Sequence, residues 1–326
     1  MCLIRRYKMK KLVTFGCLLI ISSTTAVHGW GFFGHRTINY SAVFTCPKEI
    51  FPFYKKHIVT IQNQSVNPDK RRYIIEEEAP RHYLDADFYE KSTPLDTIPH
   101  NYDSAIARYG EAAVLSHGIV PWYVITMKHR LTWAFAHGEV DQIIRLSADI
   151  GHYIADLHVP LHSTHNYNGQ LTDQHGIHGF WESRLPELFS KDYDFFVGEA
   201  KYIHNVSEEV WKHFEQSYGA KDSVLLIEKK LNQSIKQDKK YTYEQRGNQN
   251  IKTYSQYYSD LYHKKLDNMV ERRMRESILM VGSMWFTCWV DAGQPDLKAL
   301  MEPTISPSEE DSIDLNEPIK GRFEPH

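Results

Sequence analysis

The chain has 326 residues, enough for one large domain or two small ones. Hydrophobic residues make up 42% of it, which excludes a wholly disordered protein because this content can form a core. The formal net charge is −3, so the chain has no general electrostatic attraction for nucleic acid or for an anionic membrane.

Residues 1–29 have the pattern of a signal peptide. Five basic residues precede an apolar run over residues 12–21, and Val27 and Gly29 follow as the small residues before the cut. We expect cleavage between Gly29 and Trp30 and a secreted or periplasmic mature protein. A membrane anchor is disfavoured because the apolar run is too short to span about 30 Å of hydrocarbon. Cleavage would change the net charge from −3 to −8, so any phosphate recognition must come from a local site such as a metal.

Helical periodicity dominates the rest of the chain, and the two-residue alternation of strands is scarce. Residues 34–45, 48–62 and 104–136 predict helices, with Pro121 kinking or breaking the third. Polar residues 235–252 predict a loop between helices.

Three further helices follow from local signals. One begins near Gly138 and stops before Pro160, because proline disfavours helical geometry in the preceding residue. Asn205 followed by Glu208 predicts the cap of another. The last helix has an apolar stripe with steps of three or four, formed by Leu266, Val270, Met274, Ile278, Val281, Trp285 and Cys288.

We therefore predict a single all-α domain over residues 30–297. Residues 298–326 are rich in Pro, Glu, Asp and Ser and predict a polar disordered tail. The run Glu76-Glu77-Glu78 is interpreted as a solvated face rather than a cation site. Cys46 and Cys288 remain after the leader, and a disulfide and two buried free thiols are equal alternatives.

Histidines are concentrated between residues 152 and 182, where six of the 18 occur. His152 and Asp156 lie four residues apart, as do His178 and Glu182, so each pair projects from one helical face. We expect the second pair on a short helix that Pro186 limits or kinks. Imidazole and carboxylate groups at this spacing suit a divalent metal. Neither a His-Glu-x-x-His nor a Cys-x-x-Cys motif is present, which argues against a zincin protease and a zinc finger.

The spacing His152-x3-Asp156-x5-His162, followed by His178-x3-Glu182, resembles the signature of the zinc-dependent phospholipase C and single-strand nuclease (P-one type) superfamily. The motif resemblance covers most of residues 30–182, and downstream it rests on helical character alone.

Other motifs extend the resemblance towards the N-terminus. The segment from Trp30 to His35 resembles the nuclease branch, in which the mature chain begins with tryptophan and a histidine follows five residues later. Asp69, with Arg72 three residues on, and His82, in His-Tyr-Leu-Asp, resemble two further family motifs.

The resemblance implies an all-α domain that encloses three zinc ions. The implied ligands are Asp69, His82, His152 and Asp156 for the first ion, His162, His178 and Glu182 for the second, and His35, Asp156 and the amine and carbonyl of Trp30 for the third.

The implied activity is hydrolysis of a phosphodiester, in which a metal-bound hydroxide attacks phosphorus. Asp69 is a candidate to orient the water, Asp156 bridges two ions, and Arg72 either reaches a phosphate oxygen or forms a surface salt bridge. Tyr83 and Asp85 resemble the nuclease residues that stack on and hydrogen-bond a base. Both branches of the family carry a similar stretch, however, and Tyr83 could equally flank an acyl-glycerol chain.

The motifs divide on the substrate. The spacing from Trp30 to His35 favours a nuclease, whereas Glu182 and the short gap between His162 and His178 favour a phospholipase C-like subgroup, which we prefer. The alternatives are a single-strand nuclease or 3′-nucleotidase and a non-catalytic periplasmic zinc-binding protein. The expected partner is a phospholipid head group or single-stranded nucleic acid, and no obligate protein partner is implied.

Four nearby polar residues have no place in the family pattern. We expect surface or supporting roles for His158, His165 and His175. Asp149 is either a partner for an imidazole or an exposed carboxylate.

Overall fold

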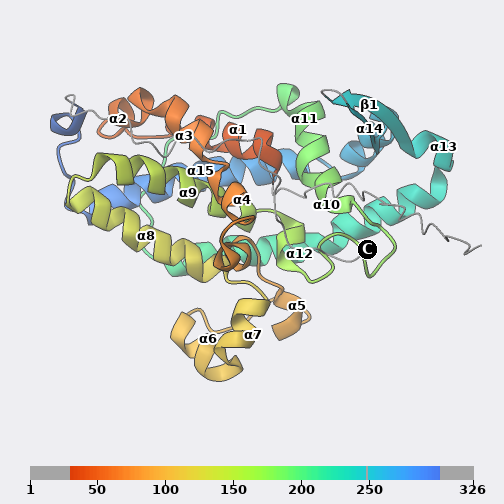
Figure 1. The fold of residues 1–326 in the computed structure, drawn as a ribbon, viewed down its shortest axis with the longest axis horizontal. Coiled ribbons are helices and arrows are strands. Elements are labelled where there is room, and N and C mark those ends of the chain that lie inside the picture. The colour runs from red at the N-terminus through yellow and green to blue at the C-terminus, as the bar shows by residue number, and fades with distance from the viewer. Residues whose placement is uncertain (1–29, 247–248, 302–326) are drawn as a thin grey trace, which may run out of the picture.

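The computed structural model describes residues 30–246 and 249–301 (Figure 1). The predicted signal peptide, which ends at Gly29, lies outside the described residues. The tail beyond residue 301 lies outside them as well. Within the described residues, no helix is both long and apolar enough to cross a membrane.

The first half of the described chain is helical. Its elements are α1 (Gly31–Val43), α2 (Phe51–Lys56), α3 (Ile58–Gln64), α4 (Asn67–Arg71), η1 (Glu76–His82), α5 (Ala86–Tyr89), α6 (Tyr102–Tyr109), α7 (Glu111–Ser116), α8 (Val120–Ala136) and α9 (Val140–Leu157).

The second half adds one small hairpin. Its elements are η2 (Pro160–Ser163), α10 (Ile177–Gly179), η3 (Phe180–Arg184), α11 (Leu185–Phe189), η4 (Ser190–Asp192), α12 (Val206–Ser234), α13 (Gln237–Lys240), β1 (Tyr241–Arg246), β2 (Gln249–Tyr254), α14 (Gln256–Lys265), α15 (Met269–Asp291) and η5 (Ala299–Met301). The predicted all-α class is confirmed.

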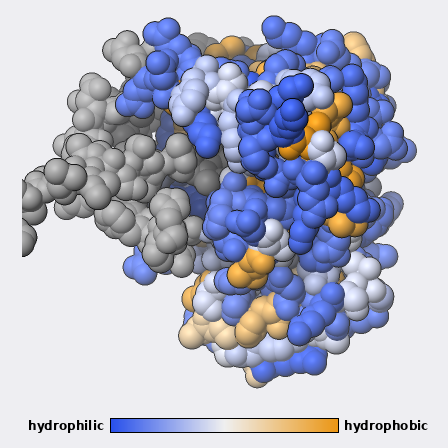
Figure 2. Space-filling view, turned by 90° about the vertical axis from the view of Figure 1, so that its right-hand side faces the viewer, coloured by the Kyte–Doolittle hydropathy of each residue, from blue (hydrophilic) through white to orange (hydrophobic). Residues whose placement is uncertain are grey.

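Helix α9 lies at the centre of the fold. It packs against α8, α15, α3 and α1, and Figure 1 shows the long helices running lengthwise while α5, α6 and α7 project from one side. Nearly every residue of α9 from Ile143 onward is buried, because neighbours surround it on several sides. The predicted apolar stripe is buried against this core, as expected. Its first residue, Leu266, caps the end of α14, and the residues from Val270 onward lie on α15. On the face in Figure 2, the described surface is mainly hydrophilic, with hydrophobic side chains in small groups.

The capping prediction for α12 is confirmed, since the Asn205 side chain accepts a hydrogen bond from the backbone N–H of Glu208 at 3.2 Å. The single helix expected over residues 104–136 is wrong in detail. Gly110 and Gly118, with positive φ angles of 83° and 87°, separate α6, α7 and α8, and Pro121 lies in the first turn of α8, where proline is tolerated.

The predicted loop over residues 235–252 is also wrong, because β1 and β2 form an antiparallel hairpin there. Its strands contain tyrosine, threonine and isoleucine, which favour β-structure. The prediction of a loop considered only the polar composition of the whole segment. Tyr254 is buried, and its ring stacks on Phe180 with 3.7 Å between centroids. The hairpin is therefore stabilised by packing against η3 as well as by its own register. Cys46 and Cys288 are buried free thiols, which decides between the two alternatives for this pair.

We expect Gly118→Ala to destabilise the fold more than Gly110→Ala does. Both positions have positive φ, so alanine costs about 1–3 kcal/mol of backbone strain at either. A Cβ at Gly118 would also collide with the carbonyl oxygen of Tyr83, whereas nothing lies within 4 Å at Gly110. Urea unfolding should show an additional loss of about 1–3 kcal/mol for Gly118→Ala. Equal losses would contradict this assignment of the close contact.

Candidate metal centre

Separate parts of the chain bring imidazole and carboxylate groups into one buried cluster. The contributors are His35 from α1, Asp69 from α4, His82 from η1, His152 and Asp156 from α9, His162 from η2, His178 from α10 and Glu182 from η3. All are at most 6% exposed. The structure therefore brings together every side chain that the family resemblance selected as a metal ligand.

Local structure explains how the second helical pair is presented. The Nε2 of His178 lies 2.9 Å from Glu182 Oε2, across one turn that runs from α10 into η3. The π-helical turn η3 leads directly into α11, where Pro186 occupies the first turn. Pro186 lacks the N–H that would bond to the carbonyl of Glu182, and the wider π turn accommodates this loss. The expectation that Pro186 limits or kinks the helix is thus replaced by a continuous helix with a π turn.

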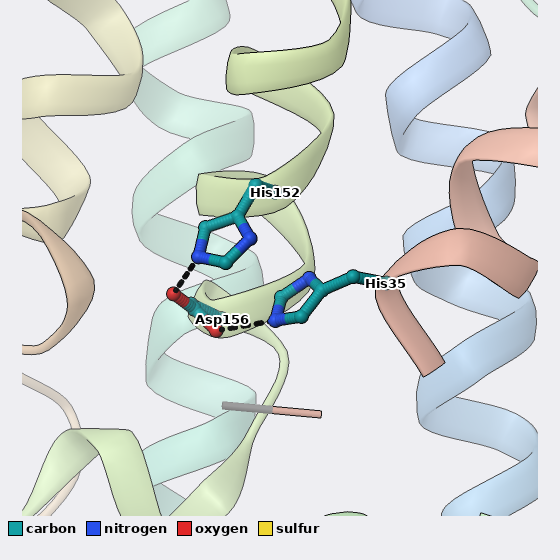
Figure 3. Close-up of side chains that lie close together, drawn as sticks. All are labelled: His35, His152 and Asp156. Carbon is teal, nitrogen blue, oxygen red and sulfur yellow. Dashed lines mark ion pairs between the residues drawn. The ribbon is translucent and has the colours of Figure 1, made fainter. Parts of the chain in front are cut away.

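Asp156 is the point at which the cluster converges. Its Oδ2 lies 2.8 Å from His82 Nδ1 and 3.2 Å from His152 Nε2, while its Oδ1 lies 3.4 Å from His35 Nε2. Figure 3 shows His35 reaching from α1 towards the carboxylate that α9 presents beside His152. The Nδ1 of His162 lies 3.6 Å from Oδ1 as well. Asp156 can therefore bridge neighbouring cations.

Three groups within the cluster have ligand atoms close enough to hold a metal ion. In each group, the three ligand atoms lie within 4.8 Å of one another. The groups are His35, His152 and Asp156; Asp69, His82 and His152; and His162, His178 and Glu182.

Trp30 lies against this cluster. Its indole Nε1 donates a 2.6 Å hydrogen bond to the carbonyl of Ala155, and its ring lies 5.0 Å from that of Trp181. Ala155 and Trp181 immediately precede Asp156 and Glu182 in the chain. The side chain of Trp30 thus fixes this end of α1 beside two candidate ligands, and ligation by a free Trp30 amine stays a prediction.

Buried polar atoms make the cluster suitable for a cation. Both carboxylate oxygens of Asp69 and the Nδ1 of His35 are buried and have no hydrogen-bond partner among the described residues. Burying such groups without a partner costs free energy. A divalent ion coordinated by nitrogen and oxygen would offset that cost for Asp69, and the mixed donor set suits zinc.

The protonation equilibria of the cluster are displaced from their usual ranges. Burial and the nearby His152 lower the pKa of His35. Burial alone would lower the pKa of His152, but Asp156 and Asp69 raise it to about 9. Burial raises the pKa of Glu182 to about 8. Metal binding by His152 and Glu182 therefore requires release of their protons.

Backbone carbonyls orient two of the imidazoles. His152 Nδ1 donates to the carbonyl of Ser65, and His162 Nδ1 donates to the carbonyl of His82, each at 2.8 Å. A ring nitrogen that donates to a carbonyl carries the hydrogen, so the Nε2 lone pair of each ring is left for the cluster.

Glu78 is a supporting residue that the sequence interpretation missed. Glu76 and Glu77 are exposed as expected, but Glu78 is fully buried, so the solvated-face interpretation is wrong for it. Its Oε1 accepts a hydrogen bond from Tyr153 and lies 3.7 Å from His82 Nε2. The spacing Glu78-x3-His82 repeats that of the other two pairs and was the available signal.

Arginines balance the charge of this support. Glu78 Oε2 accepts a 2.6 Å hydrogen bond from Arg81. Burial opposes ionisation of Glu78, yet the nearby His82, the hydrogen bond from Tyr153 and the charge of Arg71 lower its pKa. Arg71 also donates two hydrogen bonds to Asp149, at 3.2 and 3.0 Å. Asp149 is therefore neither an imidazole partner nor exposed, as it faces the guanidinium of Arg71.

Arg72 lies at the solvent side of the cluster. Its Nη1 is 3.8 Å from Asp69 Oδ1, and 32% of its side chain is exposed. Tyr83 and Asp85 flank Leu84, whose N–H donates a 2.9 Å hydrogen bond to the carbonyl of His162. The segment that carries these two candidate substrate contacts therefore runs directly beside the cluster.

Two of the three nearby histidines that have no place in the family pattern lie at the surface, and the third is buried. His165 and His175 are exposed, as predicted, and His165 Nδ1 lies 3.5 Å from Asp85 Oδ2. His158 is fully buried, so a surface position is wrong for it.

Comparison with known proteins finds no matching family model and no matching curated protein. The solved structures that resemble this chain include an alpha toxin from Clostridium absonum, at 13% identity and a TM-score of 0.45. They also include the Clostridium perfringens alpha-toxin of an avian strain, at 12% identity and a TM-score of 0.44. The alignments cover 78% and 83% of this chain but only 64% and 66% of those chains, less than two thirds of either. Assignment of the site therefore rests on this chain's own residues.

We expect Glu78→Gln to weaken metal binding, because the amide orients and polarises His82 less well. Loss of such a supporting carboxylate costs about 10–100-fold in metal affinity. Glu77→Gln, one residue away and exposed, is the matched control. Competition with a chelator of known zinc affinity measures both variants, and equal affinities would show that Glu78 does not support the site.

Proposed function

We propose that the protein is a zinc-dependent phosphodiesterase, with a phospholipase C-like activity favoured. The observation that carries the proposal is the convergence of buried imidazoles and carboxylates on Asp156 from elements far apart in the chain. Such a mixed donor set leaves coordination positions for water, as catalytic zinc sites do.

The zinc ligands in this proposal are those that the family resemblance implies. Asp69, His82, His152 and Asp156 would hold the first ion, His162, His178 and Glu182 the second, and His35, Asp156 and the backbone of Trp30 the third. Close groups of side chains in the cluster, namely Asp69, His82 and His152; His162, His178 and Glu182; and His35, His152 and Asp156, support this arrangement.

Zinc, when bound, supplies an activated water and neutralises charge on a phosphodiester. Asp69 Oδ1 and Oδ2 have no hydrogen-bond donor in the described chain, so one of them can accept a hydrogen bond from a water molecule and orient it. The guanidinium of Arg72 can donate to a phosphate oxygen, because it is partly exposed beside Asp69. Burial of the surrounding side chains excludes bulk water and strengthens these interactions.

A nuclease or 3′-nucleotidase is the second candidate, and one observation favours it. Phe88 is 51% exposed and stacks on His117, with 3.6 Å between ring centroids. His117 lies 3.5 Å from Asp85, close to the partly exposed Tyr83. Exposed aromatic rings beside a hydrogen-bonding carboxylate suit an unstacked base. The preference for a lipid head group depends on Glu182 and on the motif spacing.

We also propose that the protein acts outside the cytoplasm after cleavage before Trp30. The third metal depends on this step, because only a free terminus offers an amine. With a pKa near about 8, that amine is readily deprotonated for ligation.

The test of the proposed activity uses the mature protein, beginning at Trp30, loaded with zinc. We expect turnover of bis-p-nitrophenyl phosphate that a chelator abolishes and zinc restores. Asp156→Asn should lower kcat/KM by a factor on the order of 100 or more, since it removes the bridging carboxylate. Asp173→Asn, at an exposed position, is the control.

Parallel assays on phosphatidylcholine, single-stranded DNA and a 3′-nucleotide separate the candidate substrates. A zinc-loaded protein that cleaves none of these compounds would contradict the enzyme and favour non-catalytic zinc binding.

Blocking the N-terminus should remove one zinc ion. A protein that retains a methionine or a tag before Trp30 has no free amine there, so we expect the third ion to be lost and activity to fall by orders of magnitude, roughly 100-fold. Elemental analysis and the same assay measure both effects, with the proteolytically trimmed protein as control. An extended protein that binds three zinc ions and turns over normally would refute terminal ligation.

A further inference from the structure

A second cluster of potential ligands lies where three long helices meet. His158 caps the C-terminal end of α9, His213 lies on α12, and Glu276 lies on α15. One ligand atom from each residue lies within 4.8 Å of the other two. None of the three belongs to the candidate metal centre.

Hydrogen bonds fix the tautomers of the two histidines. His158 Nδ1 lies 2.7 Å from the carbonyl oxygen of Ile154, which can only accept, so Nδ1 carries the hydrogen. His213 Nε2 lies 3.1 Å from Glu209 Oε1. Glu209 is paired with the ammonium of Lys212, at 3.1 Å and 3.2 Å, and is therefore an ionised acceptor. His213 Nε2 must then carry its hydrogen too.

The two remaining ring nitrogens face each other. His158 Nε2 and His213 Nδ1 are 3.1 Å apart, and in the neutral rings both carry only a lone pair. Two lone pairs at this distance repel unless a cation lies between them. A metal ion at this point would coordinate both nitrogens and recruit the Glu276 carboxylate as a third ligand, whereas a shared proton would use only the two rings.

We propose that His158 Nε2, His213 Nδ1 and Glu276 form a further divalent metal site, suited to zinc. Two imidazoles and one carboxylate are an established zinc donor set, with water completing the coordination. His213 and Glu276 side chains are 14% and 39% exposed, so an ion can enter from solvent.

The neighbouring arginine is compatible with this site. Arg273 donates hydrogen bonds to the backbone carbonyls of His158 and His213, each at 3.0 Å. These two bonds leave both the imidazole rings and the Glu276 carboxylate available to a metal. Its Nη1 pairs with Glu276 Oε2, and Gln216 Oε1 lies 3.3 Å away as a second acceptor. A carboxylate has two oxygens, so Glu276 can keep Oε2 on Arg273 and offer Oε1 to the metal.

The site would act as a structural clamp. It joins the end of α9, the helix that carries His152 and Asp156, to α12 and α15. A metal there stabilises the folded protein by mass action, because the unfolded chain does not hold the three ligands together. The proposal is independent of the phosphodiesterase activity, since different residues carry it.

Zinc counting tests the clamp in the full mature protein. We expect His213→Gln to bind one zinc ion fewer than the wild type after dialysis and to lose part of the rise in Tm that zinc produces. His204→Gln, at an exposed position just before α12, should behave as wild type. Glu276→Gln keeps both imidazoles and should bind this ion at least about tenfold more weakly, since even loss of a supporting group costs that much.

Circular dichroism checks that both variants are folded, and chelator titration resolves the affinities. Folded His213→Gln and Glu276→Gln proteins with the zinc content and zinc-dependent Tm of the wild type would overturn the proposal. A ¹⁵N spectrum of the zinc-saturated wild type that shows a proton shared between the two rings would overturn it as well.

Discussion

The buried carboxylate of Asp156 is the interaction on which the structure of the site depends. It is fully buried, and imidazoles of His35, His82 and His152 lie within 3.4 Å of it. A carboxylate removed from water is stable only with cations or hydrogen-bond donors around it. The fold supplies these partners from α1, η1 and α9, and the same arrangement can hold metal ions.

The helices must approach closely to create this environment. Gly151 precedes His152 on α9, and a Cβ at that position would collide with the side chain of Asn39 on α1. The missing side chain therefore allows α1 and α9 to pack tightly. This contact brings His35 beside His152, whose rings stack with 3.8 Å between centroids. The close contact between α1 and α9 thus contributes to the packing of the core and also places two imidazoles of the polar cluster.

The supporting groups are as specific as the cluster itself. The carbonyls of Ser65 and His82 fix the tautomers of His152 and His162. The carboxylate of Glu78 lies 3.7 Å from the Nε2 of His82. Arg71 joins this support to the central helix through Asp149. Partners of this kind tune and orient metal ligands. Their burial in the core explains how side chains from several short elements can be held in one geometry.

Sequence alone predicted the parts of the site that follow from local periodicity. The pairs His152–Asp156 and His178–Glu182 share helical faces because four residues make about one turn. Asp69, His82 and His35 came from the family resemblance, since no local rule specifies that α4, η1 and α1 converge on α9.

The elements that the sequence interpretation missed depend on tertiary context. Glu78 is buried only because Tyr153 and the arginines enclose it. The β1–β2 hairpin packs on Phe180, which lies far away in the chain. His158 is buried by α12 and α15, so its partner His213 could not be inferred from spacing.

Metal binding by the cluster around Asp156 can be tested directly. Diffraction from crystals of the mature protein, measured above and below the zinc absorption edge, locates each zinc ion directly. We expect anomalous peaks beside Asp156, within coordination distance of His82 and His152, and beside Glu182. A zinc-replete crystal with no anomalous peak at either carboxylate would contradict this expectation.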